Sequence, residues 1–153
     1  MEKDHKKQVT IYTDGGCEPN PGVGGWAAVL LYESTRKEIT GSDPDTTNNR
    51  MEMTAALRAL ESLKESCRVI LFTDSEYLKR GITEWLPKWK KNRWSRKGGS
   101  LKNVDLWQEL DDAITRHEVE WRWVRGHGGI KDNERCDELV SKAIATQYRK
   151  IRK

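Results

Sequence analysis

The chain has 153 residues, a 35% hydrophobic fraction, a 34% charged fraction and a formal net charge of +4. This length suits one compact domain, and the positive balance is compatible with a nucleic-acid partner without identifying one. The three cysteines form no C-x-x-C pair, which argues against a disulfide framework and a structural zinc site. No apolar run reaches the length of a membrane span, so we expect no membrane partner. Together with the cysteine pattern this favours a cytoplasmic protein, and nothing in the sequence suggests more than a monomer.

The polarity pattern predicts a chain of alternating strands and helices. In order, we expect strands over Gln8–Thr13, Gly25–Glu33 and Arg36–Ser42, a helix over Arg50–Ser66, a strand over Arg68–Thr73, helices over Ser75–Gly81, Thr83–Asn92 and Val104–Arg116, a strand over Glu118–Val124, and a helix over Asn133–Gln147. Between them, Gly15–Gly24 is predicted to be a turn, and Arg93–Lys102 and Gly126–Asp132 are predicted loops.

This order predicts an α/β fold with a mixed five-stranded sheet and helices on both faces. The first three strands would form an antiparallel meander, and helical crossovers would add parallel strands to it. We expect a single domain over residues 8–147, with a flexible basic tail over 1–7 and a basic C-terminal tail over 148–153.

Four acidic residues lie where predicted elements begin or end, and each has an ordinary structural explanation. Asp14 could form an Asx turn after the first strand. Asn49 and Glu52 match a helix capping box. Asp74 could cap the following helix, and Asp137 could complement the dipole of the last one.

Taken together, the four acids indicate a metal site. Asp14 and Asp74 end predicted parallel strands, and open α/β sheets bind ligands beyond the carboxyl ends of such strands. Glu52 and Asp137 begin helices that can reach the same edge of the sheet. Clustered carboxylates repel one another unless a cation neutralises them, and hard oxygen ligands select Mg²⁺, for which Mn²⁺ can substitute. Two such ions about 4 Å apart can catalyse phosphodiester hydrolysis.

The chain resembles bacterial type 1 ribonuclease H in five motifs that keep the family's order and spacing. They are TDGGCEPNPGVGGW (13–26), TTNNRMEM (46–53), FTDSEYL (72–78), KWKKNRW (88–94) followed by KNVDLWQEL (102–110), and VRGHGG with DNERCDEL (124–139). The resemblance implies a ribonuclease H-like fold. It also implies a Mg²⁺-dependent endoribonuclease that hydrolyses the RNA strand of RNA–DNA hybrids and leaves 3′-hydroxyl and 5′-phosphate ends.

The resemblance also assigns roles to individual residues. Asp14, Glu52, Asp74 and Asp137 would be the metal-binding catalytic acids. His127, in a Gly-His-Gly-Gly loop, would assist proton movement or product release.

Substrate contacts are implied in two regions. Asn20, Asn48 and Asn49, with the backbone around Cys17, would contact the minor groove and the ribose 2′-hydroxyls, and Thr47 would bind a phosphate of the DNA strand. The basic, tryptophan-rich segment from Lys79 to Lys97 would grip the DNA strand. Its predicted contact residues are Trp85, Lys88, Lys90, Lys91, Arg93 and Trp94.

Two departures from the family and two alternative functions stay open at this point. Gly16 and Pro19 differ from the commoner serine and glycine in the predicted substrate loop. Glu76 occupies a substrate-contact position where many relatives carry glutamine, and an ionised glutamate cannot donate a hydrogen bond. A nucleic-acid binding module that has lost catalysis would often lack one of the acids, and all four are present. A DNA nuclease or integrase of the same fold would share the acids without the TTNNRMEM, GHGG and tryptophan–lysine segments together.

Overall fold

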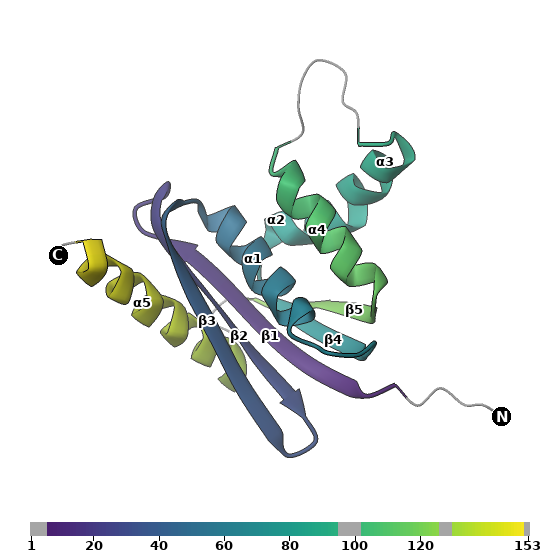
Figure 1. The fold of residues 1–153 in the computed structure, drawn as a ribbon, viewed down its shortest axis with the longest axis horizontal. Coiled ribbons are helices and arrows are strands. Elements are labelled where there is room, and N and C mark those ends of the chain that lie inside the picture. Colours follow the sequence, from purple (N-terminus) through teal and green to yellow (C-terminus); the bar gives the residue numbers. More distant parts are fainter. Residues whose placement is uncertain (1–5, 95–101, 126–129, 152–153) are drawn as a thin grey trace.

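The structure is a computed structural model that describes residues 6–94, 102–125 and 130–151. A five-stranded sheet with the order β3-β2-β1-β4-β5 forms its centre (Figure 1). The strands are β1 (Gln8–Cys17), β2 (Gly22–Tyr32), β3 (Thr35–Thr46), β4 (Arg68–Thr73) and β5 (Glu118–Trp123). The first three strands pair antiparallel, whereas β4 pairs parallel with both β1 and β5. The predicted mixed sheet is therefore confirmed.

Helices cover both faces of this sheet. They are α1 (Asn48–Glu61), α2 (Glu76–Arg80), the π-helical turn η1 (Gly81–Trp85), α3 (Leu86–Lys91), α4 (Val104–Thr115) and α5 (Lys131–Ile151). α1 packs on β1 and β2 with α4 beside it, while α5 packs along β1, β2 and β3 (Figure 1). Alternate residues of β2 separate the two layers: Ala28 and Leu30 join the core under α1, and Ala27 and Val29 join the core under α5.

The glycine-rich segment after the first strand is more regular than predicted. β1 continues through Gly15 and Gly16 to Cys17, and β2 already begins at Gly22, which leaves a short loop between them. Gly16 pairs with Gly25 across the ladder. These glycines signal a turn in the sequence, but in the structure they allow helices to pack closely on the sheet.

Lys7 and Tyr148, which lie in the two predicted tails, contact the rest of the fold. The carbonyl oxygen of Lys7 accepts a hydrogen bond of 2.8 Å from the backbone N–H of Arg68. α5 runs through residue 151, beyond the predicted helix end at Gln147. The hydroxyl of Tyr148 donates to the carbonyl of Glu18, which attaches this part of α5 to the β1–β2 loop. In the part of the chain that the structure describes, no helix has the length and apolarity needed to cross a membrane.

The predicted break near Gly81 is a continuous helical path with a wider turn. α2, η1 and α3 follow one another without a loop, and Pro87 lies in the first turn of α3, where proline is tolerated. A Cβ atom at Gly81 would lie 1.9 Å from a ring carbon of Trp107, so glycine is required by the close approach of this indole. The three helical pieces and α4 together form a lobe that projects beyond the sheet (Figure 1).

Candidate active site

Two carboxylates lie at the same edge of the sheet because β1 and β4 are adjacent parallel strands. Asp14 lies in β1 opposite Ala27 of β2, and Asp74 directly follows Thr73, the last residue of β4. Asp14 and Asp74 line one pocket as predicted, although β1 continues past Asp14 to Cys17, so that Asp14 does not end its strand. Neither acid has its alternative structural role. Asp14 forms no Asx turn, because it lies within a strand. Asp74 does not cap α2, because Ser75 is the cap and accepts a hydrogen bond from the backbone N–H of Leu78.

The helix carrying Glu52 brings a third carboxylate to this edge. One carboxylate oxygen each from Asp14, Glu52 and Asp74 lies within 4.8 Å of the others. The capping-box explanation for Glu52 is wrong, because the N-cap of α1 is Thr47, whose hydroxyl accepts from the backbone N–H of Arg50 at 3.2 Å. Glu52 is thus the fifth residue of α1 and is free to take part in the cluster.

Asp137 adds a fourth acid from the opposite helix layer. α5 begins at Lys131, so Asp137 lies in its second turn and not in the first turn as predicted. It lines a pocket of about 210 Å³ together with the other three acids. The remaining residues that line this pocket are Gly15, Gly16, Asn133, Glu134 and Val140.

Burial and mutual repulsion make the pocket unfavourable for uncompensated negative charge. Burial raises the pKa of Asp14 to about 7, with a further increase from Asp74, while the backbone N–H of Gly15 opposes the shift. Burial also raises the pKa of Glu52 to about 7, and a hydrogen bond with Ser75 opposes that increase. A divalent cation would remove this cost by neutralising the carboxylates, so the donor set fits a hard metal ion.

These shifts predict how the stability of the metal-free protein depends on pH. Because the folded pKa values of Asp14 and Glu52 exceed their ordinary values near 4, the stabilisation from their protonation is present below about pH 4 and lost as the pH rises through 7. We expect Asp14→Asn to increase the free energy of unfolding by about 2 kcal/mol at pH 8 and by much less at pH 5. Urea unfolding in EDTA at the two pH values measures the difference. An equal gain at both would contradict the shift.

The predicted minor-groove residues gather around the ends of β1, β3 and α1. Asn20 Oδ1 accepts a hydrogen bond of 3.2 Å from the backbone N–H of Asn48. Cys17 Sγ donates to the carbonyl of Thr46 at 3.3 Å and also contacts the carbonyl of Pro19. The chain segments containing Cys17, Asn20 and Asn48 are therefore fastened to one another.

Three predicted substrate-contact residues lie at the starts of α1 and α2: Thr47, Asn49 and Glu76. Thr47 caps α1, and Asn49 lies half-buried in its first turn. Glu76 is the first residue of α2, directly beyond Asp74 and Ser75, and its side chain is exposed. This exposure leaves Glu76 accessible to a ligand beside the metal pocket.

The projecting lobe is organised by aromatic packing. The rings of Trp85 and Trp89 are stacked with a centroid distance of 6.0 Å, and Trp85 and Tyr77 form an edge-to-face contact at 5.2 Å. Trp89 also contacts Trp94 and the fully buried Trp107. Trp85 and Trp94, both predicted to contact substrate, are therefore half-buried members of this cluster.

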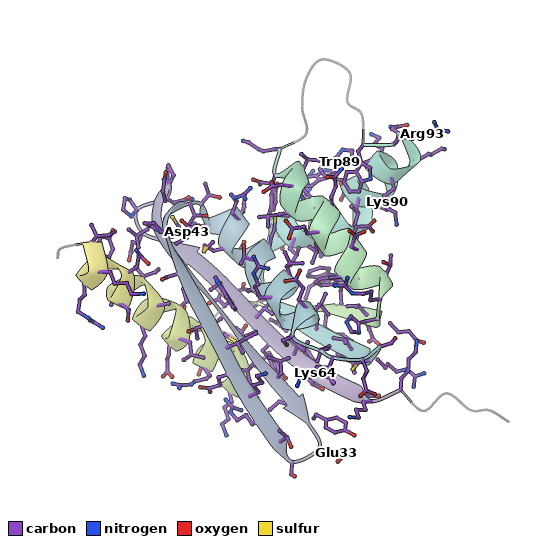
Figure 2. All side chains as sticks on the ribbon, viewed as in Figure 1. Glu33, Asp43, Lys64, Trp89, Lys90 and Arg93 are labelled. Atoms are coloured by element: carbon purple, nitrogen blue, oxygen red, sulfur yellow. The ribbon has the colours of Figure 1, made fainter. Side chains whose placement is uncertain are left out.

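The basic residues of the lobe differ in whether they form an ion pair within the protein. Lys90 forms an ion pair of 3.1 Å with Asp111 of α4, whereas Lys88, Lys91 and Arg93 are exposed. Figure 2 shows Arg93 at the outer end of the lobe and Lys64 well away from it, in the lower part of the view. The lobe and the carboxylate pocket form separate parts of the surface, joined by α2. His127 lies outside the described residues.

The sequence reasoning missed two features near the site. Arg50, next to the predicted Asn49, donates to both carboxylate oxygens of Asp105 at 3.1 and 2.8 Å and so joins α1 to α4. Asn133 and Glu134 line the carboxylate pocket. The spacing of four residues between Asn133 and Asp137 places both on one helix face and could have indicated Asn133.

Comparison with known proteins agrees with this geometry. Residues 6–145 match the model of the RNase H family. The chain is 57% identical over 141 residues to ribonuclease HI of Pseudomonas aeruginosa, covering 92% of this chain and 95% of that protein. It is 58% identical over 136 residues to ribonuclease H of Granulibacter bethesdensis, covering 88% and 91%.

Solved structures extend the agreement to the fold. LC9-RNase H1, a type 1 RNase H, superimposes with a TM-score of 0.85 at 33% identity, over 95% of this chain and 76% of that one. LC11-RNase H1, solved in complex with an RNA/DNA hybrid, superimposes with a TM-score of 0.69 at 25% identity, over 90% and 97%. The chain therefore belongs to the ribonuclease H family, among its bacterial type 1 members.

Proposed function

We propose that this protein is an endoribonuclease that hydrolyses the RNA strand of RNA–DNA hybrids with Mg²⁺, for which Mn²⁺ can substitute. The observation that carries the proposal is the approach of Asp14, Glu52 and Asp74 oxygens to within 4.8 Å in a chain of the ribonuclease H family. The hybrid bound by LC11-RNase H1 supports the choice of substrate. The three free cysteines agree with a reducing cytoplasm, and we expect a monomer.

The four acids would hold the metal ions, and the ions would contact the scissile phosphate. Asp14, Glu52 and Asp74 would hold one ion, and Asp137 would complete the site from α5. The bound ions would supply an activated water and neutralise charge on the phosphate. Water adds to phosphorus and the bond to the 3′ oxygen breaks, which leaves a 3′-hydroxyl and a 5′-phosphate. His127 would move a proton near the site or assist product release.

Recognition of the hybrid would use the two regions beside the pocket. Asn20, Asn48 and Asn49 would read ribose 2′-hydroxyls and base edges in the minor groove, with Cys17 shaping the loop and Thr47 binding a DNA phosphate. The exposed carboxylate of Glu76 would reduce affinity for the nearby backbone in comparison with a glutamine. The lobe would contact the DNA strand through Trp85 and Trp94 and through Lys88, Lys90, Lys91 and Arg93.

A cleavage assay with three duplexes tests the proposed function. Labelled RNA–DNA hybrid, RNA duplex and DNA duplex of one sequence are incubated with the protein, with Mg²⁺ and with EDTA. We expect cleavage of the RNA strand of the hybrid alone, only with Mg²⁺, and 5′-phosphate product ends. Cutting of the DNA duplex at a similar rate would favour the DNA nuclease alternative, and binding without cutting would favour the binding module.

Neutralising the exposed cations of the lobe should weaken hybrid binding in a salt-dependent way. Each cation that neutralises a phosphate of duplex DNA contributes about 0.9 to the slope of log affinity against log salt. Lys88→Gln, Lys91→Gln and Arg93→Gln combined should therefore lower the slope by about 2 to 3. Lys90→Gln should have less effect, since Lys90 is already paired with Asp111.

The control for this experiment is Lys64→Gln, which removes a positive charge far from the lobe (Figure 2). Binding is measured in Ca²⁺, by fluorescence anisotropy over a range of salt concentrations. If the triple variant and the control keep the slope of the parent, the lobe does not contact the phosphates.

A further inference from the structure

Asn133 is a buried polar residue at the carboxylate pocket. It is the third residue of α5, is 5% exposed and lines the pocket together with Asp14, Glu52, Asp74 and Asp137. Asn133 and Asp137 are four residues apart on one helix, so their side chains leave the same face one turn from each other. The amide therefore belongs to the same wall of the pocket as the fourth acid.

No described residue offers a hydrogen bond to the side-chain amide of Asn133. Among the other buried polar side chains, Thr13 donates to the carbonyl of Phe72, and Thr73 and Ser75 accept from the backbone, whereas the hydroxyl of Thr46 also lacks a partner among the described residues. Asn133 lines the pocket, so a ligand held there can supply the partner of its amide.

The chemistry of the amide complements that of the four acids. Ionised carboxylates only accept hydrogen bonds and add negative charge, whereas an asparagine offers an acceptor oxygen and two donors without charge. Mg²⁺ in proteins usually keeps several of its water ligands, and these waters donate hydrogen bonds. An uncharged acceptor can orient such a water without adding to the repulsion that already raises the pKa of Asp14 and Glu52.

We propose that Asn133 is a positioning residue of the metal site, whose amide oxygen accepts a hydrogen bond from a water ligand of the bound ion. This inference rests on the metal site of the proposed function and adds an uncharged member to it. Partners that orient the ligands of a metal typically contribute about 10- to 100-fold to its affinity or to activity.

Metal binding without substrate tests the inference directly. Mn²⁺ binding to the parent and to Asn133→Ala is measured by electron paramagnetic resonance, and Mg²⁺ binding by calorimetry. We expect about 10-fold weaker Mn²⁺ binding in Asn133→Ala. Asn133→Asp, which keeps the acceptor oxygen, should bind Mn²⁺ at least as tightly as the parent. Ser141→Ala is the control, because Ser141 is an exposed residue of α5 that does not line the pocket.

Three further measurements separate the inference from its alternatives. Thermal unfolding in EDTA should be nearly unchanged in Asn133→Ala, and hybrid affinity in Ca²⁺ should change by less than twofold. The Mg²⁺ concentration for half-maximal cleavage should rise by the same factor as the dissociation constant for Mn²⁺. Unchanged Mn²⁺ affinity in Asn133→Ala overturns the inference, as does weaker hybrid binding with metal affinity intact, which would make Asn133 a substrate contact.

The same data distinguish this inference from the proposed function. A parent that binds Mn²⁺ but does not cut a hybrid would contradict the endoribonuclease, while a loss of Mn²⁺ affinity in Asn133→Ala would still support the role of Asn133. In the converse case, the parent cuts the hybrid while Asn133→Ala leaves the Mn²⁺ affinity unchanged. That result would support the endoribonuclease and would show that Asn133 does not belong to its metal site.

Discussion

Asp14→Asn should abolish cleavage of an RNA–DNA hybrid and leave hybrid binding intact. Asp14 lies at the centre of the cluster, since its pKa responds to Asp74, Asp137 and Glu52. An amide of the same shape would bind the metal more weakly and would not balance its charge. Metal assistance contributes several kcal/mol to phosphoryl transfer, and each 1.36 kcal/mol is tenfold in rate, so we expect a loss on the order of 10³-fold or more.

The measurement pairs single-turnover cleavage in Mg²⁺ with hybrid affinity in Ca²⁺. Asp112→Asn is the matched control, because Asp112 is an exposed acid of α4 that lies outside the pocket, and this variant should cut at the parent rate. Parent-like cleavage by Asp14→Asn would remove Asp14 from the metal site. Loss of hybrid affinity by more than about tenfold would instead show that the variant disturbs the fold or the substrate surface.

The sequence pattern predicted those parts of the fold that depend on residues close together in the chain. The apolar run from Arg68 to Thr73 has the bounds of β4, and the position of Asp74 follows from that strand end. The parallel pairing of β4 with β1 follows from the order of elements and the constraints on crossovers. Two of the four acids could therefore be placed together from periodicity and topology alone.

Helix ends and ion pairs could not be predicted from the sequence, because they depend on tertiary contacts. Thr47 caps α1 two residues earlier than the predicted cap Asn49, which moves Glu52 from the third to the fifth helical position. The first turns of α5 are fastened to β3 by ion pairs of 2.6 Å between Arg36 and Asp132 and of 2.9 Å between Arg135 and Glu38. These partners are about 100 residues apart, and no local pattern connects them.

These ion pairs bear on the site because α5 carries Asp137. Arg135 and Arg36 hold the pKa of Glu38 down at about 2, so the contacts persist throughout the pH range in which the metal site works. The helix segment from Lys131 to Glu138 is thus attached to the edge strand on one side and lines the carboxylate pocket on the other. The position of the fourth acid depends on this attachment as well as on its place in the sequence.

Gly15→Ala is expected to disrupt both folding and the metal site. A Cβ atom at position 15 would lie 2.4 Å from the carbonyl carbon of Met51 and 2.5 Å from the backbone nitrogen of Glu52. These atoms belong to the backbone of α1 and cannot move aside alone, so the helix must shift away from β1. Overpacking of this kind costs about 1–3 kcal/mol, and a displacement of about 1 Å at a catalytic group can reduce the rate about 100-fold.

Gly16→Ala provides the matched control on the neighbouring residue of the same strand. There an added Cβ would first meet a side-chain methyl group of Val140 at 3.3 Å, which a small rotation can relieve. Urea unfolding and single-turnover cleavage should show a large loss in Gly15→Ala and a small one in Gly16→Ala. Gly15 follows Asp14 in β1 and lies against the backbone of the helix that carries Glu52. Equal activity of the two variants would therefore mean that the distance between β1 and α1 does not control the metal site.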